Sequence, residues 1–149
     1  MSLDPPAHVR EGYLLLTTAA RLVQRRLDDA LAPLGLTRAG VIALRTLAPH
    51  PMNQEQLAAV IHVQSQTLGR VLARLDRRGL ITRKRDPDDR RQFQVEITDA
   101  GESVLLAARR AESAAIPADF GQWDTLRDQL SQFVKYFQDT RQAPGSTPS

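Results

Sequence analysis

The first third of the chain carries an apolar stripe at the spacing of an α-helix. Leu15, Leu22 and Val23 recur at intervals that place them on one side of such a helix. The pattern predicts a first helix over residues 8–31, which Pro33 would end. A helix of roughly 24 residues is longer than most helices of small domains, so we expect it to need a partner outside its own core.

Three shorter helices are predicted next, each with a start or stop signal. Thr37 is a favoured N-cap for a second helix, which Pro49 ends. Asn53 caps a third helix, and Gln56 completes a capping box with it. A fourth helix is predicted over residues 65–79, and it ends on a glycine of the kind that commonly follows a helix. Its apolar stripe has the spacing i, i+3, i+4 and i+7 and consists of Leu68, Val71, Leu72 and Leu75.

The periodicity then changes from that of a helix to that of a strand. Residues 80–83 form a short strand candidate, and residues 93–97 alternate apolar with polar side chains, which is typical of a half-buried strand. Residues 86–89 lie between them and read Asp-Pro-Asp-Asp, a sequence that favours a turn. We therefore expect a hairpin over residues 80–97 that packs on the preceding helices, because a lone hairpin is marginal in water.

Two further helices are predicted, one capped by Thr98 and reaching residue 116, the other over residues 121–140. This order predicts a mainly α winged helix-turn-helix fold of about six helices with a two- or three-stranded β wing. We expect a dimer, because both terminal segments carry long apolar stripes. The predicted division is an N-terminal dimerisation helix (1–36), a winged helix-turn-helix DNA-binding domain (37–98), C-terminal dimerisation helices (99–140) and a flexible tail (141–149).

The distribution of charge narrows the class of partner. Residues 65–95 contain nine Arg or Lys and four Asp, a net charge of +5, whereas the rest of the chain has eleven basic and thirteen acidic residues, a net charge of −2. This concentration favours an anionic partner for the segment, although a solvated, salt-bridged face explains the charge equally well on this ground alone.

Several other classes of function are disfavoured by the residues present. The chain has no cysteine, which excludes disulfides, thiolate metal sites and thiol redox sensing. The most apolar stretch, residues 14–23, is too short and too polar to span a membrane, and the N-terminus has no signal-peptide pattern, so we expect the cytoplasm. The three histidines are scattered, and neither a phosphate-binding glycine loop nor a nucleophile elbow occurs. We expect no enzyme activity, metal or cofactor.

The predicted fourth helix carries the candidate DNA-binding residues. Only about three residues separate it from the third helix, the turn length that a helix-turn-helix requires. It begins with Ser65, Gln66 and Thr67, whose polar side chains can reach base edges and phosphates from a helix N-terminus. Arg70 and Arg74 follow at positions where arginine reads guanine or holds the DNA backbone. Double-stranded DNA is therefore the expected partner.

Between Tyr13 and Phe137 the chain resembles the MarR family of bacterial transcription regulators. The most specific match is residues 85–101, RDPDDRRQFQVEITDAG, which is similar to the family's wing signature of Asp-x-Arg, a strand, Leu or Ile with Thr, and Gly. A second match is residues 66–81, QTLGRVLARLDRRGLI, which resembles the family's recognition helix and its exit.

The resemblance implies a homodimer with interleaved N- and C-terminal helices that binds a short palindrome. It also implies that Asp89 orients the wing and that Arg91 enters the minor groove. Many members are repressors that a small, often aromatic or anionic, ligand releases. Two positions depart from the family: Gly69 replaces a usual Ser or Thr, and Gly40 replaces a longer polar residue.

Some alternatives stay open on the sequence alone. Ser65 is equally well explained as an N-cap. Asp89 and Arg91 can also form a surface salt bridge, a role that is compatible with their role in the wing. Phe120 and Trp123 are expected in the core or the dimer interface rather than in a ligand site. For the whole domain, the alternatives are a winged helix that docks an acidic protein partner and an architectural protein that binds DNA without sequence preference.

Overall fold

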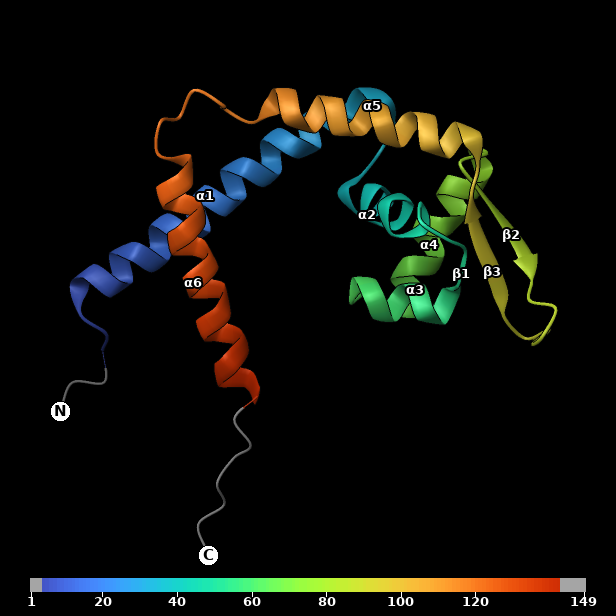
Figure 1. Cartoon of the computed structure of the whole chain (residues 1–149), viewed down its shortest axis with the longest axis horizontal. Helices are drawn as coiled ribbons and strands as arrows, with labels where there is room; N and C mark the ends of the chain where they lie inside the picture. The colour runs from blue at the N-terminus through green and yellow to red at the C-terminus, as the bar shows by residue number, and fades with distance from the viewer. Residues whose placement is uncertain (1–3, 143–149) are drawn as a thin grey trace, which may run out of the picture. The chain divides into compact units, whose positions relative to one another are not determined.

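The computed structural model describes residues 4–142, and within them the chain forms six α-helices, a short 3₁₀ turn and three strands (Figure 1). The helices and strands have these bounds: α1 Ala7–Leu31, η1 Ala32–Leu34, α2 Arg38–Leu47, β1 Met52–Asn53, α3 Gln54–Ile61, α4 Ser65–Arg77, β2 Ile81–Arg85, β3 Phe93–Ile97, α5 Asp99–Ala115 and α6 Trp123–Gln142. The winged helix-turn-helix fold expected from the sequence is confirmed. The predicted tail begins inside α6, which extends two residues beyond residue 140, and its remainder lies outside the described residues.

The wing is the hairpin of β2 and β3, which belongs to a small antiparallel sheet with the strand order β1-β3-β2. The hairpin expected over residues 80–97 is present, with Ile81 opposite Ile97 and Arg85 opposite Phe93. The third strand, β1, pairs Met52 with Val95. A strand of two residues is too short to produce an alternating pattern, so only the tertiary pairing reveals it.

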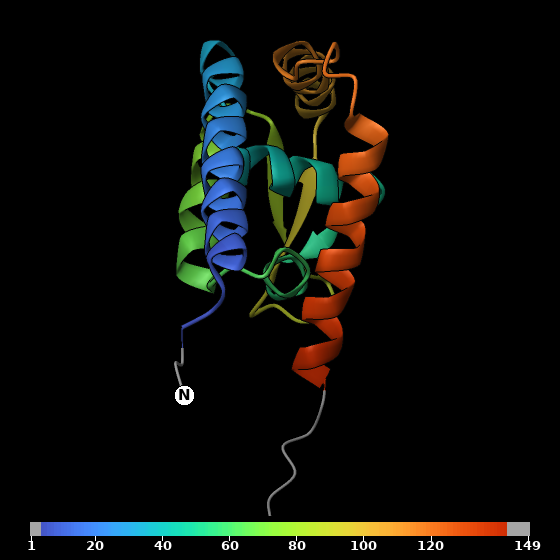
Figure 2. The same ribbon diagram turned by 90° about the vertical axis from the view of Figure 1, so that its left-hand side faces the viewer.

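A single cluster of aliphatic side chains joins the helix-turn-helix to the sheet. Leu44 and Leu47 of α2, Leu57 of α3 and Val95 of β3 are each at most 1% exposed. Helix α4 adds the buried side chains Leu68, Leu72 and Leu75, and α5 adds Leu105 and Ala108. Helix α2 lies between α5 and α3 in both views (Figures 1 and 2). Because α4 contributes three leucines to this core, its opposite side is available to solvent.

The helix ends confirm most of the expected capping signals. Thr37 Oγ1 accepts from the Gly40 N–H at 3.1 Å, and Asn53 forms a reciprocal capping box with Gln56. After α4, Gly79 has a φ of +70° and the Leu80 N–H donates to the Leu75 carbonyl at 3.0 Å, a bond that closes the helix end in a Schellman arrangement. Glycine adopts this left-handed conformation without the steric penalty that a side chain would add.

The chain divides between Ile116 and Pro117 into two compact units. The first unit holds the winged helix-turn-helix together with α1 and α5, and the second holds α6. Within the second unit, Phe120 packs edge-on against Trp123 with ring centroids 5.6 Å apart, and the Trp123 indole donates to the Pro117 carbonyl at 2.9 Å.

Among the described residues, no single helix has the length and apolarity needed to cross a membrane. Only the pair formed by residues 7–34 and 38–47, bent by 75° at the break, meets both requirements when its halves are combined.

Candidate nucleic-acid interface

Helix α4 presents a polar, basic side opposite its buried leucines. Residues 66, 70 and 77 follow at intervals of four and seven, so that Gln66, Arg70 and Arg77 lie on the side away from Leu68 and Leu72. All three polar side chains are exposed. The residues that the sequence predicted to bind DNA include Gln66 and Arg70 but not Arg77. Arg77 follows Arg70 by seven residues, or about two helical turns, and this spacing could have indicated that both lie on the same side of α4.

The remaining predicted residues of α4 lie on its flanks. Thr67 and Arg74 are exposed and, with Arg70, line a hollow of about 320 Å³ between α4 and residues 35–40. Ser65 lies exposed on the other flank at the first position of the helix. The N-cap residue is Gln64, and no side chain caps this end, so the interpretation of Ser65 as the N-cap is wrong. Its hydroxyl is consequently not used by the helix itself.

The turn before α4 sets the angle at which this helix follows α3. Helix α3 ends at Ile61, and His62 then takes a left-handed conformation with a φ of +55°. The Val63 N–H donates to the Ala58 carbonyl at 3.3 Å, which closes the end of α3 before α4 begins. The short turn expected from the sequence is therefore present.

Asp89 shapes the tip of the wing through the backbone. Its Oδ1 accepts from the backbone N–H of Arg91 at 3.0 Å, and its carbonyl accepts from the Gln92 N–H at 3.0 Å. Asp86 makes a similar turn, in which Oδ1 accepts from the Asp88 N–H at 2.9 Å. No ion pair links the Asp89 carboxylate to the Arg91 guanidinium within the described residues, so the salt-bridge alternative is wrong.

The basic residues between positions 65 and 95 divide into those whose side chains contact other protein groups and those whose side chains do not. Arg83 pairs with Asp76 at 3.2 Å, Arg85 stacks over Phe93 at 5.6 Å, and Arg78 donates to backbone carbonyls. In the part of the chain that the structure describes, the other group has no side-chain hydrogen bond or ion pair, and it consists of Arg70, Arg74, Arg77, Lys84, Arg90 and Arg91. These cations are on α4 and on the wing, so the positive charge that the fold leaves available is concentrated on those two elements.

Besides the aliphatic core, two polar side-chain contacts among the described residues attach the wing to the helix-turn-helix. Gln92, at the base of the wing tip, donates to the Glu55 carboxylate of α3 at 3.1 Å. Arg83 of β2 reaches Asp76 near the end of α4. Residues from both helices thus hold the wing, and neither contact was predicted, because residues 37 and seven positions apart in different elements leave no periodic signal in a sequence.

The seven residues predicted to bind DNA are all exposed, on α4 and at the wing tip. Their contacts with bases and phosphates are predictions. Among the described residues there is no cluster of three or more side chains suited to a metal ion.

Comparison with known proteins agrees with this geometry. A family model described as the MarR family matches residues 34–92, which run from η1 to the wing. A probable transcriptional regulator from Pseudomonas aeruginosa is 32% identical, with a TM-score of 0.66, and the match covers 79% of this chain and 96% of that one.

Two further solved structures share the arrangement. A MarR-family transcriptional regulator from Rhodococcus sp. RHA1 has a TM-score of 0.74 and 24% identity, over 90% of this chain and 96% of that one. Reduced AbfR bound to DNA has a TM-score of 0.67 and 26% identity, over 87% of this chain and 96% of that one. Because the family model lies on the helix-turn-helix and wing and the 32% identical transcriptional regulator matches over 79% of the chain, the protein belongs to the MarR family of transcription regulators.

Proposed function

We propose that the protein is a sequence-specific regulator that binds double-stranded DNA, as a homodimer on a palindromic operator, and represses transcription. The observation that carries the proposal is the group of available cations on α4 and the wing, which contains Arg70, Arg74 and Arg91. Phosphate neutralisation by such cations supplies most of the affinity of non-specific DNA binding. The DNA-bound structure of AbfR, a relative with the same fold, supports a duplex as the partner.

In this proposal α4 is the recognition helix and enters the major groove. Ser65, Gln66 and Thr67 contact phosphates and base edges from its N-terminal end. Arg70 reads a base, and Arg74 holds the backbone or a second base. Asp89 fixes the wing tip, which directs Arg91 into the minor groove, where arginine is favoured by the negative potential. The helix-turn-helix and wing over residues 37–98 form the DNA-binding region.

Apolar side chains exposed on α1 and α6 support the homodimer. On α1 the set comprises Val9, Tyr13, Leu14, Leu15, Leu22 and Val23, and all are at least 46% exposed. On α6, Leu126, Leu130, Phe133 and Phe137 follow a helical stripe and are at least 37% exposed. Exposed apolar patches of this extent usually mark a protein interface. We assign residues 1–36 and 99–140 to dimerisation.

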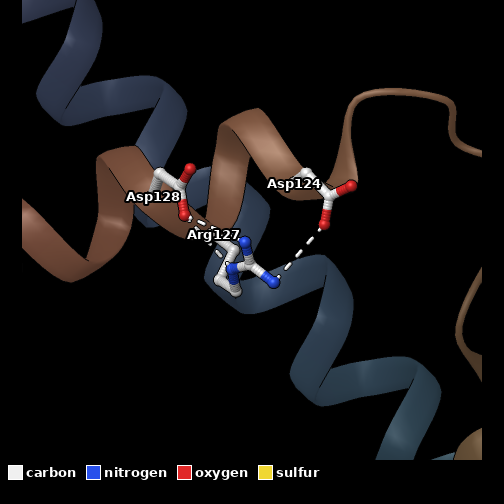
Figure 3. Close-up of polar contacts among 3 residues, drawn as sticks. All are labelled: Asp124, Arg127 and Asp128. Atoms are coloured by element: carbon white, nitrogen blue, oxygen red, sulfur yellow. Dashed lines mark hydrogen bonds and ion pairs between the residues drawn. The ribbon is translucent and has the colours of Figure 1, made fainter.

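Three charged residues of α6 outside the apolar stripe contact one another (Figure 3). Arg127 lies between Asp124 and Asp128 and pairs with them at 3.4 and 3.1 Å. All three side chains are at least 65% exposed, so these ion pairs contribute at most about 1 kcal/mol. Helix α6 thus has one apolar and one charged side, as expected of a helix that packs against a partner on one side only.

Phe133→Glu is expected to convert the dimer into a monomer, because it places a charge within the apolar stripe of α6. Sedimentation equilibrium at micromolar concentration should give about twice the chain mass of 16.6 kDa for the wild type and the single mass for the variant. Gln132→Glu is the control, because it adds the same charge outside the stripe and should leave the dimer intact. A wild-type chain that sediments as a monomer would refute the homodimer.

Asp89→Ala is expected to weaken DNA binding by about fivefold, the effect of losing a hydrogen bond of roughly 1 kcal/mol that orders the wing tip. Asp89→Asn is the matched variant, because its amide oxygen can still accept from the Arg91 N–H. We expect Asn to keep nearly full affinity in fluorescence anisotropy with a labelled operator. If Asn weakens binding as much as Ala does, the carboxylate charge matters and the backbone turn does not explain the role of Asp89.

The experiment that tests the proposed function is a binding selection from a random duplex pool at fixed physiological salt. A recovered palindrome with half-sites about one helical turn apart supports a dimeric, sequence-specific regulator. Salt-sensitive binding without a motif would instead support the architectural alternative. No binding by folded protein would favour docking of an acidic protein partner. Release by a small aromatic or anionic effector stays a prediction from the family resemblance.

A further inference from the structure

Arg78 ends the recognition helix and binds a distant part of the chain. It is the C-cap residue of α4, and its guanidinium donates from Nη1 to the Gly35 carbonyl at 2.8 Å and from Nη2 to the Leu34 carbonyl at 2.9 Å. The two acceptors belong to η1 and the residue after it, which directly continue α1. One side chain therefore connects the end of α4 to the end of α1.

The accepting backbone is shaped to receive this guanidinium. Gly35 has a φ of +66°, and a Cβ atom on it would lie 3.2 Å from both Cζ and Nη1 of Arg78. The positive φ favours glycine at this position, and a side chain there would also press on the guanidinium and shift it by a few tenths of an ångström. The Leu36 N–H donates to the Leu31 carbonyl at 3.3 Å, which fixes the turn that presents the two carbonyls. The planar fork of arginine matches two adjacent acceptors in a way that the single ammonium of lysine does not.

Other contacts hold the same end of α4. Asp76 pairs with Arg83 of β2, and the Gly79 carbonyl accepts from Thr98 Oγ1 at 2.7 Å. The N-terminal end of α4, by contrast, has no side-chain cap. The buried leucines hold α4 along its length, and these polar side-chain contacts fix its C-terminal end, where Arg78 supplies the link to α1.

We propose that Arg78 is a positioning residue that sets where the recognition helix lies relative to α1, and through it the half-site spacing that the dimer accepts. The proposal rests on the proposed function, in which α1 is part of the dimer interface and α4 reads DNA. Since the spacing of two half-sites must match the spacing of two recognition helices, a loosened link at Arg78 lowers the discrimination between operators of different spacing. Arg78 acts through α4 and needs no DNA contact for this role.

The first test measures the link without DNA. The chain has no cysteine, so spin labels can be placed on the paired substitutions Gln24→Cys in α1 and Gln66→Cys in α4, with labelled chains diluted into unlabelled ones. Pulsed electron resonance should give a narrow distance distribution for the otherwise wild-type chain and a broader or shifted one with Arg78→Ala. Arg77→Ala removes the same charge from a side chain without a partner among the described residues, and it should leave the distribution unchanged. An unchanged distribution in Arg78→Ala overturns the proposal.

The second test uses the operator recovered by selection and versions lengthened or shortened by one or two base pairs. Arg78→Ala is expected to lose roughly tenfold affinity for the natural spacing and to bind all spacings nearly equally, with Arg78→Lys in between. Arg77→Ala should lose affinity equally at every spacing. A uniform loss with Arg78→Ala overturns the proposal and makes Arg78 a phosphate contact. If the wild type binds no operator, the proposed function fails, whereas the distance measurement still decides whether Arg78 positions α4.

Discussion

Gly101→Ala is expected to lower the free energy of unfolding by about 3 kcal/mol, the upper end for an overpacked core. A Cβ atom on Gly101 would overlap the Leu80 carbonyl oxygen and lie 2.7 Å from Ile97 Cγ1. Two hydrogen bonds hold the backbone in this position: the Gly101 N–H donates to Thr98 Oγ1 at 3.1 Å, and the Thr98 N–H donates to the Leu80 carbonyl at 3.0 Å. Relief of the clash requires α5 to shift away from the sheet.

Chemical denaturation at one fixed protein concentration measures this effect, since the stability of a dimer depends on concentration. Gly69→Ala is the matched control, because the same methyl group in α4 would meet only Gln54 Nε2, at 3.6 Å. It should be neutral or stabilise by up to about 1 kcal/mol, the usual gain from replacing glycine inside a helix. If Gly101→Ala were as stable as the wild type, this result would contradict the close approach of Gly101 in α5 to the Leu80 carbonyl.

Arg70→Ala is expected to weaken operator binding by about 1–3 kcal/mol, which is five- to 150-fold, and to relax the base preference at one position of each half-site. The physical reason is that Arg70 lies opposite the buried leucines of α4 and has no partner within the described residues, so its guanidinium is available to a base. Anisotropy titrations at fixed salt, with the operator substituted one position at a time, measure affinity and preference separately.

Arg110→Ala serves as the control for Arg70→Ala. It removes an exposed arginine from α5, which α2 separates from α3 in Figure 1. We expect it to change the base preference at no position. A loss with Arg70→Ala that is equal for every sequence would make Arg70 a phosphate contact, and an equal loss with Arg110→Ala would attribute the effect to total charge.

Local signals in the sequence predicted most elements of the fold. The leucine stripe of α4 and the capping residues Thr37, Asn53 and Thr98 depend on neighbours within four residues, and all are confirmed. The hairpin followed from strand alternation and from the turn chemistry at its tip. These features were predictable because helix periodicity, capping and tight turns are properties of short stretches of chain.

The sequence was less informative about individual polar residues and glycines, because their roles depend on which atoms the fold brings near them. Ser65 is not the N-cap, because the helix begins one residue after Gln64 without a side-chain cap. The two unusual glycines, Gly40 and Gly69, would meet a Cβ only at ordinary contact distances. The glycine that close packing requires is Gly101, and the sequence distinguished it only as part of a family motif.

The sequence by itself determined the order of the elements, the apolar side of each helix and the concentration of basic residues between positions 65 and 95. The tertiary structure alone decided which of those cations are available. It joined Arg83 to Asp76 and Arg78 to the Leu34 and Gly35 carbonyls, and it left Arg70, Arg74 and Arg91 without protein partners among the described residues. The physical reason is that an exposed guanidinium pairs with whatever acceptor the fold brings within about 3 Å, and for Arg78 that acceptor lies 43 residues away along the chain.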